Sequence, residues 1–440
     1  MPPEIEDTCF LFHNLVKENV DMKKYIILLA TALLFGACSS DDDNDINPDD
    51  PNKAERTVLV YMAADNNLSM QSERDLLEMK EGSKMLGDRQ NLIVYIDNSE
   101  PTSSYVIRFK NGERVDSTYI SESNSADPAV LEEVLRYTRE KYPAKSYGLV
   151  LWGHADAWII ENDSVPYART RAYGYDSGLS RSYWMNIPSM ARAIANGMGG
   201  EHLRYSFADC CRFACIESAY ELRNVTDYLI GSPAEIPDPG APYQLIMPDL
   251  FNTSENFYES IINTYYDFYI EDIKERPYYY YNLTYGDLEG YSVPLAAIKS
   301  DELDNFAQAT ASLLGSIHDK LTPDGNLDND GALVYDYYWG KKFAFDIYYT
   351  LSKNTAASEF DKWKPAFMKA VPYSRFSQKW LSVSSQLRND MEQFDMSADE
   401  CGVVSMFFPN NSYRTISPNL NVAIQGFQWN NVIHWKQYGW

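Results

Sequence analysis

Two reactive side chains in this sequence stand directly after apolar, strand-like runs. His154 follows YGLVLWG (147–153), and Cys211 follows YSFADC, with Asp209 two residues before it. Continuous apolar runs predict strands buried on both faces of a parallel sheet, whose sites form beyond the carboxyl ends of the strands. Two such neighbouring strands would bring an imidazole and a thiol to one sheet edge. That pairing is the chemistry of nucleophilic acyl transfer by cysteine.

Cysteines cluster at the end of the second run, as Cys210, Cys211 and Cys215. We predict that Cys211 stands at the start of a helix, where unpaired backbone amides favour a thiolate. Cys210, one residue earlier, would point to the opposite side of the strand. We expect Cys215, one helical turn on, and Cys401 to be packed, since a free cysteine is often only a small buried apolar residue.

Strand-like and helix-like segments alternate through residues 57–285, which predicts a mostly parallel central sheet covered by helices on both faces. An alternating pair of strands around Asn111-Gly112 predicts an antiparallel hairpin. Residues 286–440 are predicted to form a C-terminal α/β domain. We expect strands at 58–62, 91–97, 104–109, 114–120, 147–152, 205–208, 227–232, 293–300 and 401–409, and helices at 72–85, 128–141, 187–195, 301–318 and 355–371.

The N-terminal region has the composition of a targeting signal. Residues 22–38 combine a basic start with an apolar stretch that is too short to span a bilayer, and they resemble a bacterial lipoprotein signal peptide with Cys38 as the lipidated residue. The acidic residues 39–56 predict a disordered tether. We therefore expect an outer-membrane lipoprotein anchored by lipid. Whether it faces the cell surface or the periplasm stays open.

Composition limits the classes of partner. The formal net charge of −25 argues against binding to nucleic acid, whose phosphates such a surface repels. An acidic surface either serves solubility or attracts basic substrates, and both interpretations stay open. We expect a monomer that needs no metal or other cofactor. The alternative is a calcium site at NLDNDG (326–331), although Tyr337 stands where the bidentate glutamate of a calcium loop belongs.

Several segments together resemble the clostripain family of cysteine peptidases, in the caspase-like clan that includes gingipains and legumains. They are the strand ending in Trp152 and His154, the run Asp209-Cys210-Cys211, and Glu217 followed by AYEL (219–222). Counting back from Glu217 puts Cys211 at the nucleophile position. Three further blocks also match: YMAADNNL, GSPAEIPDPGAPY and CGVVSMFFP. The resemblance covers most of residues 57–409.

The resemblance implies a caspase-like α/β/α sandwich with Cys211 as the nucleophile and His154 as its acid and base. Backbone amides near Ala155 and Cys211 would form the oxyanion hole. Asp209 would line a pocket for an arginine or lysine before the cleaved bond, with Asp238 as a second candidate. A plain helix N-cap is the alternative for Asp209. The implied function is an endopeptidase that cleaves peptides after basic residues.

Family members often mature by cutting themselves between the histidine and cysteine blocks. This chain offers Arg169, Arg171 and Arg181 there. Two departures from the family pattern raise the alternative of a homologue that has lost activity. Ala155 replaces a glycine and resists positive φ, and Cys210 replaces a small residue and invites oxidation. The alternative is a degenerate pseudopeptidase, a surface lipoprotein that binds peptide or glycan.

Overall fold

The computed structural model describes residues 53–98, 104–119, 124–160, 172–177, 183–237, 239–275, 290–329, 331–338, 340–381, 388–390, 397–416 and 419–440. Pro51–Trp440 form one compact unit. The predicted signal peptide with Cys38, most of the tether, the three candidate cleavage arginines and Asp238 all lie outside the described residues. Among the described residues, no helix is both long and apolar enough to cross a membrane.

Nine strands of the described chain form one sheet, in the order β14-β11-β9-β8-β5-β1-β2-β3-β4. Its five central strands run parallel, and the antiparallel strands β3, β4, β11 and β14 extend it at the two edges. The strands are β1 (Arg56–Ala64), β2 (Gln90–Asn98), β3 (Tyr105–Lys110), β4 (Glu113–Tyr119), β5 (Tyr147–Gly153), β8 (Tyr205–Asp209), β9 (Tyr228–Gly231), β11 (Leu295–Lys299) and β14 (Tyr373–Arg375).

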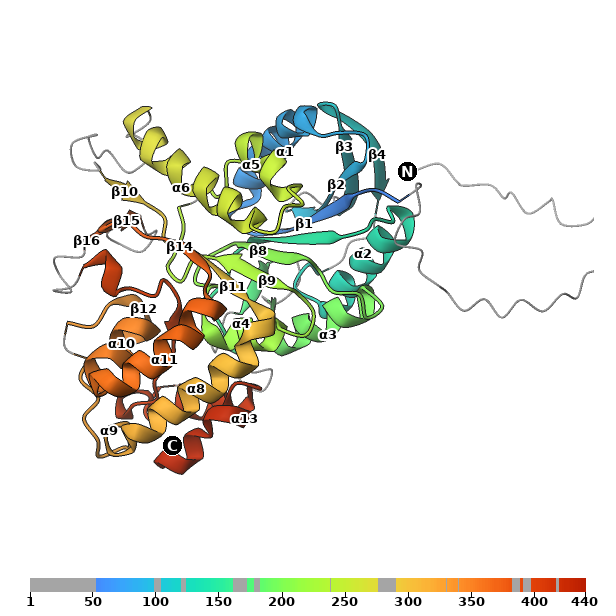
Figure 1. Cartoon of the computed structure of the whole chain (residues 1–440). Coiled ribbons are helices and arrows are strands. Elements are labelled where there is room, and N and C mark those ends of the chain that lie inside the picture. Colours follow the sequence, from blue (N-terminus) through green and yellow to red (C-terminus); the bar gives the residue numbers. More distant parts are fainter. Residues whose placement is uncertain are drawn as a thin grey trace, which may run out of the picture. The chain divides into compact units, whose positions relative to one another are not determined.

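Helices cover both faces of this sheet, as Figure 1 shows and as the apolar strands predict. One face packs against α1 (Ser69–Gly82), α5 (Tyr243–Leu250) and α6 (Phe257–Glu275); the other packs against α2 (Pro128–Lys141), α3 (Ile187–Gly197) and α4 (Ile216–Leu222). All nine residues of β1 are buried, with Leu59 in one core and Val60 in the other. The predicted mixed fold with a mostly parallel sheet is therefore confirmed.

Residues after 286 continue the same unit. Strands β11 and β14 belong to the large sheet, so a boundary at residue 285 separates no second sheet core. The predicted strand at 401–409 is only the two-residue β17 (Ser405–Met406). The remaining helices are α8 (Leu303–Ser316), α9 (His318–Leu321), α10 (Ile347–Asn354), α11 (Ala357–Ala370), α12 (Leu420–Ala423) and α13 (Asn430–Ile433).

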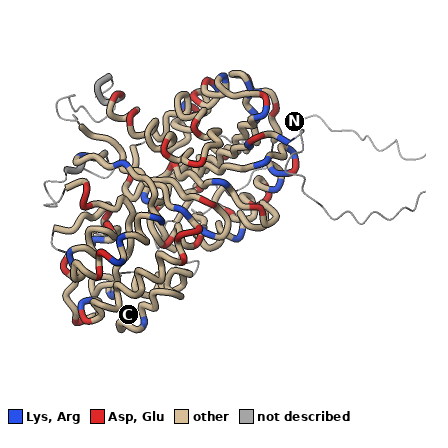
Figure 2. The backbone as a smooth tube through the Cα atoms, in the orientation of Figure 1, with Lys and Arg blue, Asp and Glu red and all other residues tan. Residues whose placement is uncertain are grey.

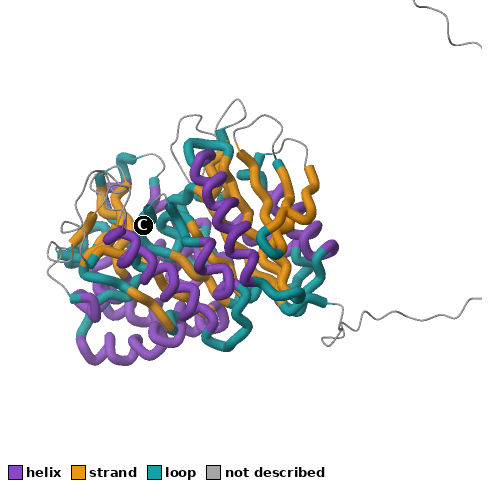
Figure 3. Tube along the Cα trace, turned by 90° about the horizontal axis from the view of Figure 1, so that it is seen from above, coloured by secondary structure: helices purple, strands orange, loops and turns teal. Residues whose placement is uncertain are grey.

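Smaller strands complete the unit, and Figure 3 shows strands and helices side by side from above. They are β6 (Tyr173–Asp176), β7 (Tyr183–Met185), β10 (Tyr291–Ser292), β12 (Val334–Tyr338), β13 (Lys341–Asp346), β15 (Lys379–Leu381) and β16 (Arg388–Asp390). Acidic and basic residues are interspersed along the described part of the backbone, as Figure 2 shows.

Candidate active site

The register of β5 and β8 sets the two reactive residues at one level. The strands are parallel and pair Trp152 with Asp209. His154 and Cys211 each follow two residues later, so both leave the sheet at the same distance beyond its carboxyl edge. Gly153 makes the exit of β5 possible. Its φ is +138°, and a Cβ there would lie 2.9 Å from the Ala63 carbonyl oxygen.

His154 is held by a residue that the sequence analysis missed. Its Nε2 lies 2.9 Å from Oδ1 of Asn67, in the turn after β1. An oxygen acceptor requires the proton on Nε2, which puts the lone pair of the neutral ring on Nδ1. The rings of Tyr175 and Trp184, on β6 and β7, lie 6.3 and 6.5 Å from the imidazole. The polar Asp65-Asn66-Asn67 turn after a buried strand was the available signal for Asn67.

Cys211 and Cys210 lie on opposite faces of the sheet. Cys211 is half-buried against the core beneath α1, α5 and α6, whereas Cys210 is buried in the other core. Both are free thiols. Burial raises the pKa of Cys211 to about 12, while neighbouring Arg212 and a hydrogen bond from the Ile236 amide, 3.5 Å from Sγ, act to lower it. In this arrangement Cys211 is a thiol rather than a thiolate at neutral pH.

The predicted helix start at Cys211 is wrong. Helix α4 begins at Ile216, with Cys215 as its N-cap residue. Arg212 has a φ of +60°, and Cys215 makes a parallel bridge to Ser405, so the chain runs in an irregular turn between strand and helix. Helical amides therefore do not stabilise an anion at Cys211. The groups that replace them are Arg212 and the Ile236 amide.

Ala155 is buried beside the β6 strand. It forms an antiparallel bridge with Tyr173, flanked by hydrogen bonds from Gly174 N to His154 O and from Asp156 N to Ala172 O, both 2.9 Å. Neither bond uses the Ala155 amide. Ala155 is not among the residues with positive φ, whereas Gly153 is. The alanine therefore imposes no backbone strain, and the expected conflict at this position does not arise.

Asp209 lies beneath the segment that leads into α5. It is 3% exposed, and its carboxylate accepts hydrogen bonds from the Ala241 amide at 3.0 Å and from the hydroxyls of Tyr243 and Tyr265 at 2.8 and 3.1 Å. Burial raises the pKa of Asp209, and these donors oppose the rise. Because α4 begins seven residues later, the N-cap interpretation is wrong. Asp209 anchors the loop before α5.

Two acidic residues of α1 and an arginine lie near Asp209. Asp75 is fully buried and accepts a hydrogen bond from Trp152 Nε1 at 2.7 Å. Burial and then the charge of Asp209 raise the pKa of Asp75 to about 8. Arg74 lies 3.4 Å from Asp75 and 3.8 Å from Glu78, and it donates to the Pro239 carbonyl at 3.0 Å. A guanidinium of the chain itself therefore lies in this acidic environment.

Comparison with known proteins decides the family. The sequence profile of the clostripain family, peptidase family C11, matches residues 60–419. This chain belongs to the clostripain family. No curated protein sequence matches it significantly.

Solved structures agree with the clostripain assignment. A secreted C11 cysteine protease from Bacteroides thetaiotaomicron, in complex with an irreversible peptide inhibitor, is 28% identical with a TM-score of 0.69 over 87% of this chain and 99% of that one. An inactive zymogen C11 protease from Parabacteroides distasonis is 25% identical, with a TM-score of 0.65 and the same coverage. Iotapain from B. thetaiotaomicron, 21% identical over 87% of this chain and all of that one, with a TM-score of 0.67, shares the fold.

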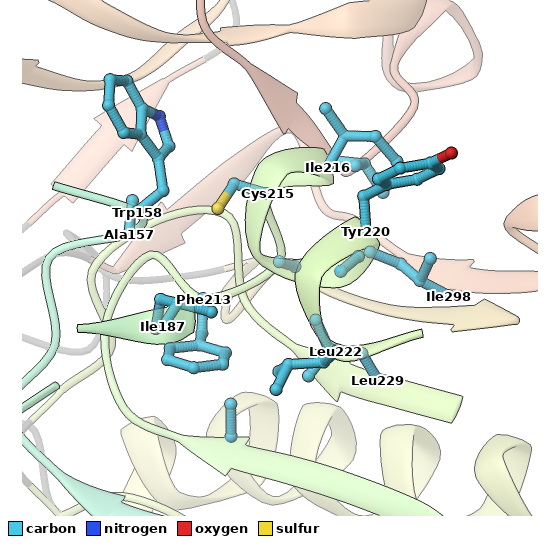
Figure 4. Packing of buried hydrophobic residues seen from close by; sticks show 14 of the residues in the cluster. Ala157, Trp158, Ile187, Phe213, Cys215, Ile216, Tyr220, Leu222, Leu229 and Ile298 are labelled. Carbon is cyan, nitrogen blue, oxygen red and sulfur yellow. The ribbon is translucent and has the colours of Figure 1, made fainter. Parts of the chain in front are cut away.

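Among the described residues of this clostripain homologue, Cys215 and Cys401 are also packed. Cys215 lies 1% exposed in the core against α4, and Figure 4 shows its side chain among buried neighbours such as Trp158 and Ile216. Cys401 packs against the same core. In the part of the chain that the structure describes, no three His, Cys, Asp or Glu residues are grouped to hold a metal ion. Asp330 of the candidate calcium segment lies outside that part.

Proposed function

We propose that this protein is a cysteine endopeptidase in which Cys211 and His154 form the catalytic dyad. The observation that carries the proposal is the parallel register of β5 and β8, which aligns the two residues at one sheet edge. Family membership supports it, because its relatives are cysteine proteases. The proposed reaction needs no cofactor, since the thiol, the imidazole and backbone amides supply every group it requires.

The proposed reaction is acyl transfer through a thioester. His154 Nδ1 takes the Cys211 proton as Sγ bonds to the substrate carbonyl carbon, and the carbonyl electrons form an oxyanion. The amides of Ala155 and Cys211 are the proposed donors to that oxyanion. As the carbon–nitrogen bond breaks, the imidazolium protonates the leaving amine. Water then hydrolyses the thioester, releases the acid and returns the proton to the thiol.

We propose that the enzyme cleaves after arginine or lysine. Support comes from the acidic environment around Asp209, Asp75 and Glu78 close to the end of β8. Both carboxylate oxygens of Asp209 already accept hydrogen bonds within the chain. Its proposed role is therefore to supply negative potential and to hold the loop before α5. Arg74 of the chain itself pairs with Asp75 and Glu78, which supports the proposal that this acidic environment can accept a guanidinium. Asp238 is proposed as a second acidic contributor.

Self-processing and lipid anchoring complete the proposal. We propose cleavage after Arg169, Arg171 or Arg181, and a relative described as an inactive zymogen supports a precursor form. Relatives described as secreted support export of this chain. The finer proposal is an outer-membrane lipoprotein anchored at Cys38 and active as a monomer.

The surroundings of Cys211 favour a second function. Cys211 is half-buried, its pKa is raised to about 12, and α4, the helix that follows it in the chain, begins only at Ile216. A protein fixed in this arrangement would be a pseudopeptidase that binds peptide or glycan without cleaving it. A catalytic protein must instead ionise the thiol once substrate and His154 are in place.

Fluorogenic peptides with Arg, Lys or Ala before the cleaved bond distinguish these functions. We expect the fragment from residue 53 to hydrolyse the basic peptides under reducing conditions, and Cys211→Ala and His154→Ala to abolish turnover. Cys215→Ala is the matched control and should retain it. Absence of turnover, together with no labelling of Cys211 by an arginine-based electrophile, would leave the pseudopeptidase ahead. A Cys211→Ala protein clipped as fast as wild type would rule out self-processing.

A further inference from the structure

We propose that Arg212 is a positioning residue that activates Cys211. It holds residues 234–236 in place so that the Ile236 amide donates a hydrogen bond to the sulfur, and it places a cation beside the developing thiolate. The inference rests on the proposed function of Cys211 as the nucleophile. It assigns to Arg212 the task that a helix N-terminus was expected to perform.

Residues 211–212 and 234–236 are joined at three successive points. The Arg212 amide donates to the Ala234 carbonyl at 2.8 Å. The Arg212 guanidinium forms an ion pair with the Glu235 carboxylate. The Ile236 amide donates to Cys211 Sγ at 3.5 Å. Because Glu235 lies directly between the other two contacts, its pairing with Arg212 fixes how far the Ile236 amide stands from the sulfur.

Three carboxylates from separate segments converge on Arg212. Besides Glu235, they are Asp156, after His154 in the chain, with Oδ1 2.5 Å from Nη1, and Asp336 of β12, with Oδ2 2.7 Å from Nε. The last contact is a close ion pair rather than an aligned hydrogen bond. The four side chains are only 9–13% exposed. Water therefore screens their charges weakly, and the guanidinium is held in one place.

The backbone conformation of Arg212 also supports a positioning role. Its φ of +60° lies in the left-handed region, which a residue with a β-carbon adopts only when its surroundings enforce it. In this conformation the side chain reaches Glu235 and Asp336. A glycine would adopt the turn with less strain but would carry no charge to the thiol.

The surrounding charges act on the thiol in opposite directions. After burial, Arg212 is the largest influence on the pKa of Cys211 and lowers it, whereas Glu235 and Asp156 raise it. Removal of the guanidinium would leave the carboxylates facing the sulfur and suppress the thiolate. Glu235→Gln would do the reverse, because its amide oxygen still accepts from the guanidinium while the negative charge that raises the pKa of Cys211 is gone. The thiol of Cys210 also interacts electrostatically with Cys211, and it remains in every variant below.

The test is the pH dependence of Cys211 alkylation by iodoacetamide, followed by peptide mass spectrometry on the folded protein. We expect Arg212→Met to shift the alkylation midpoint upward by about one pH unit or more, and Glu235→Gln to shift it downward. Arg212→Lys should keep the midpoint but lower kcat, because an ammonium cannot reproduce the forked contacts. Arg223→Met, which loses a similar arginine pair with Asp304 outside the site, should leave the midpoint unchanged.

A midpoint for Glu235→Gln equal to that of wild type would overturn the inference, and this variant decides it if Arg212→Met fails to fold. Shifts of one sign in both Arg212→Met and Glu235→Gln would also overturn it, because a purely structural cluster responds alike to loss of either partner. Peptide turnover is measured separately. A wild type without turnover but with the opposite shifts would retain this inference and reject the proposed function.

Discussion

Asn67 should be a positioning residue for His154. Its Oδ1 lies 2.9 Å from the imidazole Nε2, and the contact selects the tautomer whose basic nitrogen is Nδ1. Asn67→Ala removes this acceptor while leaving the backbone of the turn after β1 in place. The variant should therefore fold normally and lose only the orientation of the imidazole.

The expected magnitude follows from the type of hydrogen bond. A bond to a group that becomes charged during the reaction contributes about 1.5–3 kcal/mol, and solvent exposure of Asn67 reduces this to about 1–2 kcal/mol. Since about 1.4 kcal/mol corresponds to a tenfold change in rate, kcat should fall about 5- to 30-fold with little change in KM.

Steady-state kinetics across pH with an arginine peptide is the assay. Asn67→Asp keeps the acceptor and adds a charge, so it should retain most of kcat and move the acidic limb of the profile to higher pH. Asn66 is unsuitable as a control because its side chain bonds the Ala63 and Tyr175 carbonyls. If Asn67→Ala kept kcat within about twofold of wild type, the orienting role would be refuted.

Three further outcomes are expected. Gly153→Ala places a β-carbon 2.9 Å from the Ala63 carbonyl oxygen of β1 at a φ of +138°. It should displace His154 and lower the free energy of unfolding, measured by urea titration, by about 1–3 kcal/mol. Gly315→Ala, whose β-carbon would lie in open space, should leave the free energy of unfolding unchanged. Asp209→Asn should lower kcat/KM for arginine peptides about 10-fold or more and that for alanine peptides much less; equal losses would point to structural damage instead. The raised pKa of Asp75, about 8, means that its stabilising contribution is present at low pH and declines as pH rises from about 4 to about 8. Asp75→Asn, which keeps an acceptor for Trp152, should flatten stability across that window in unfolding measurements at several pH values.

Much of the fold could be predicted because apolar periodicity is a local signal. The runs around Val60, Val150 and Phe207 became central strands, and the helices at 128–141 and 187–197 fell where expected. The hairpin β6–β7, with Trp184 beside the imidazole, was missed because its strands are only four and three residues long. The strand predicted at 401–409 was too long, because an apolar segment can be buried without pairing to another strand, and only β17 pairs here.

The sequence by itself indicated the candidate pair, His154 and Cys211, and the clostripain family. A buried strand followed at once by His154 or Cys211 leaves few other interpretations, and alternation along a strand separates Cys210 from Cys211. Only the tertiary structure decided what surrounds the thiol. Helix α4 starts at Ile216, directly after the bridge from Cys215 to Ser405, and the carboxylates that pair with Arg212 come from segments as distant as Asp336. Such contacts join residues far apart in the chain, and no local pattern encodes them, because their geometry exists only once the sheet has brought those segments together.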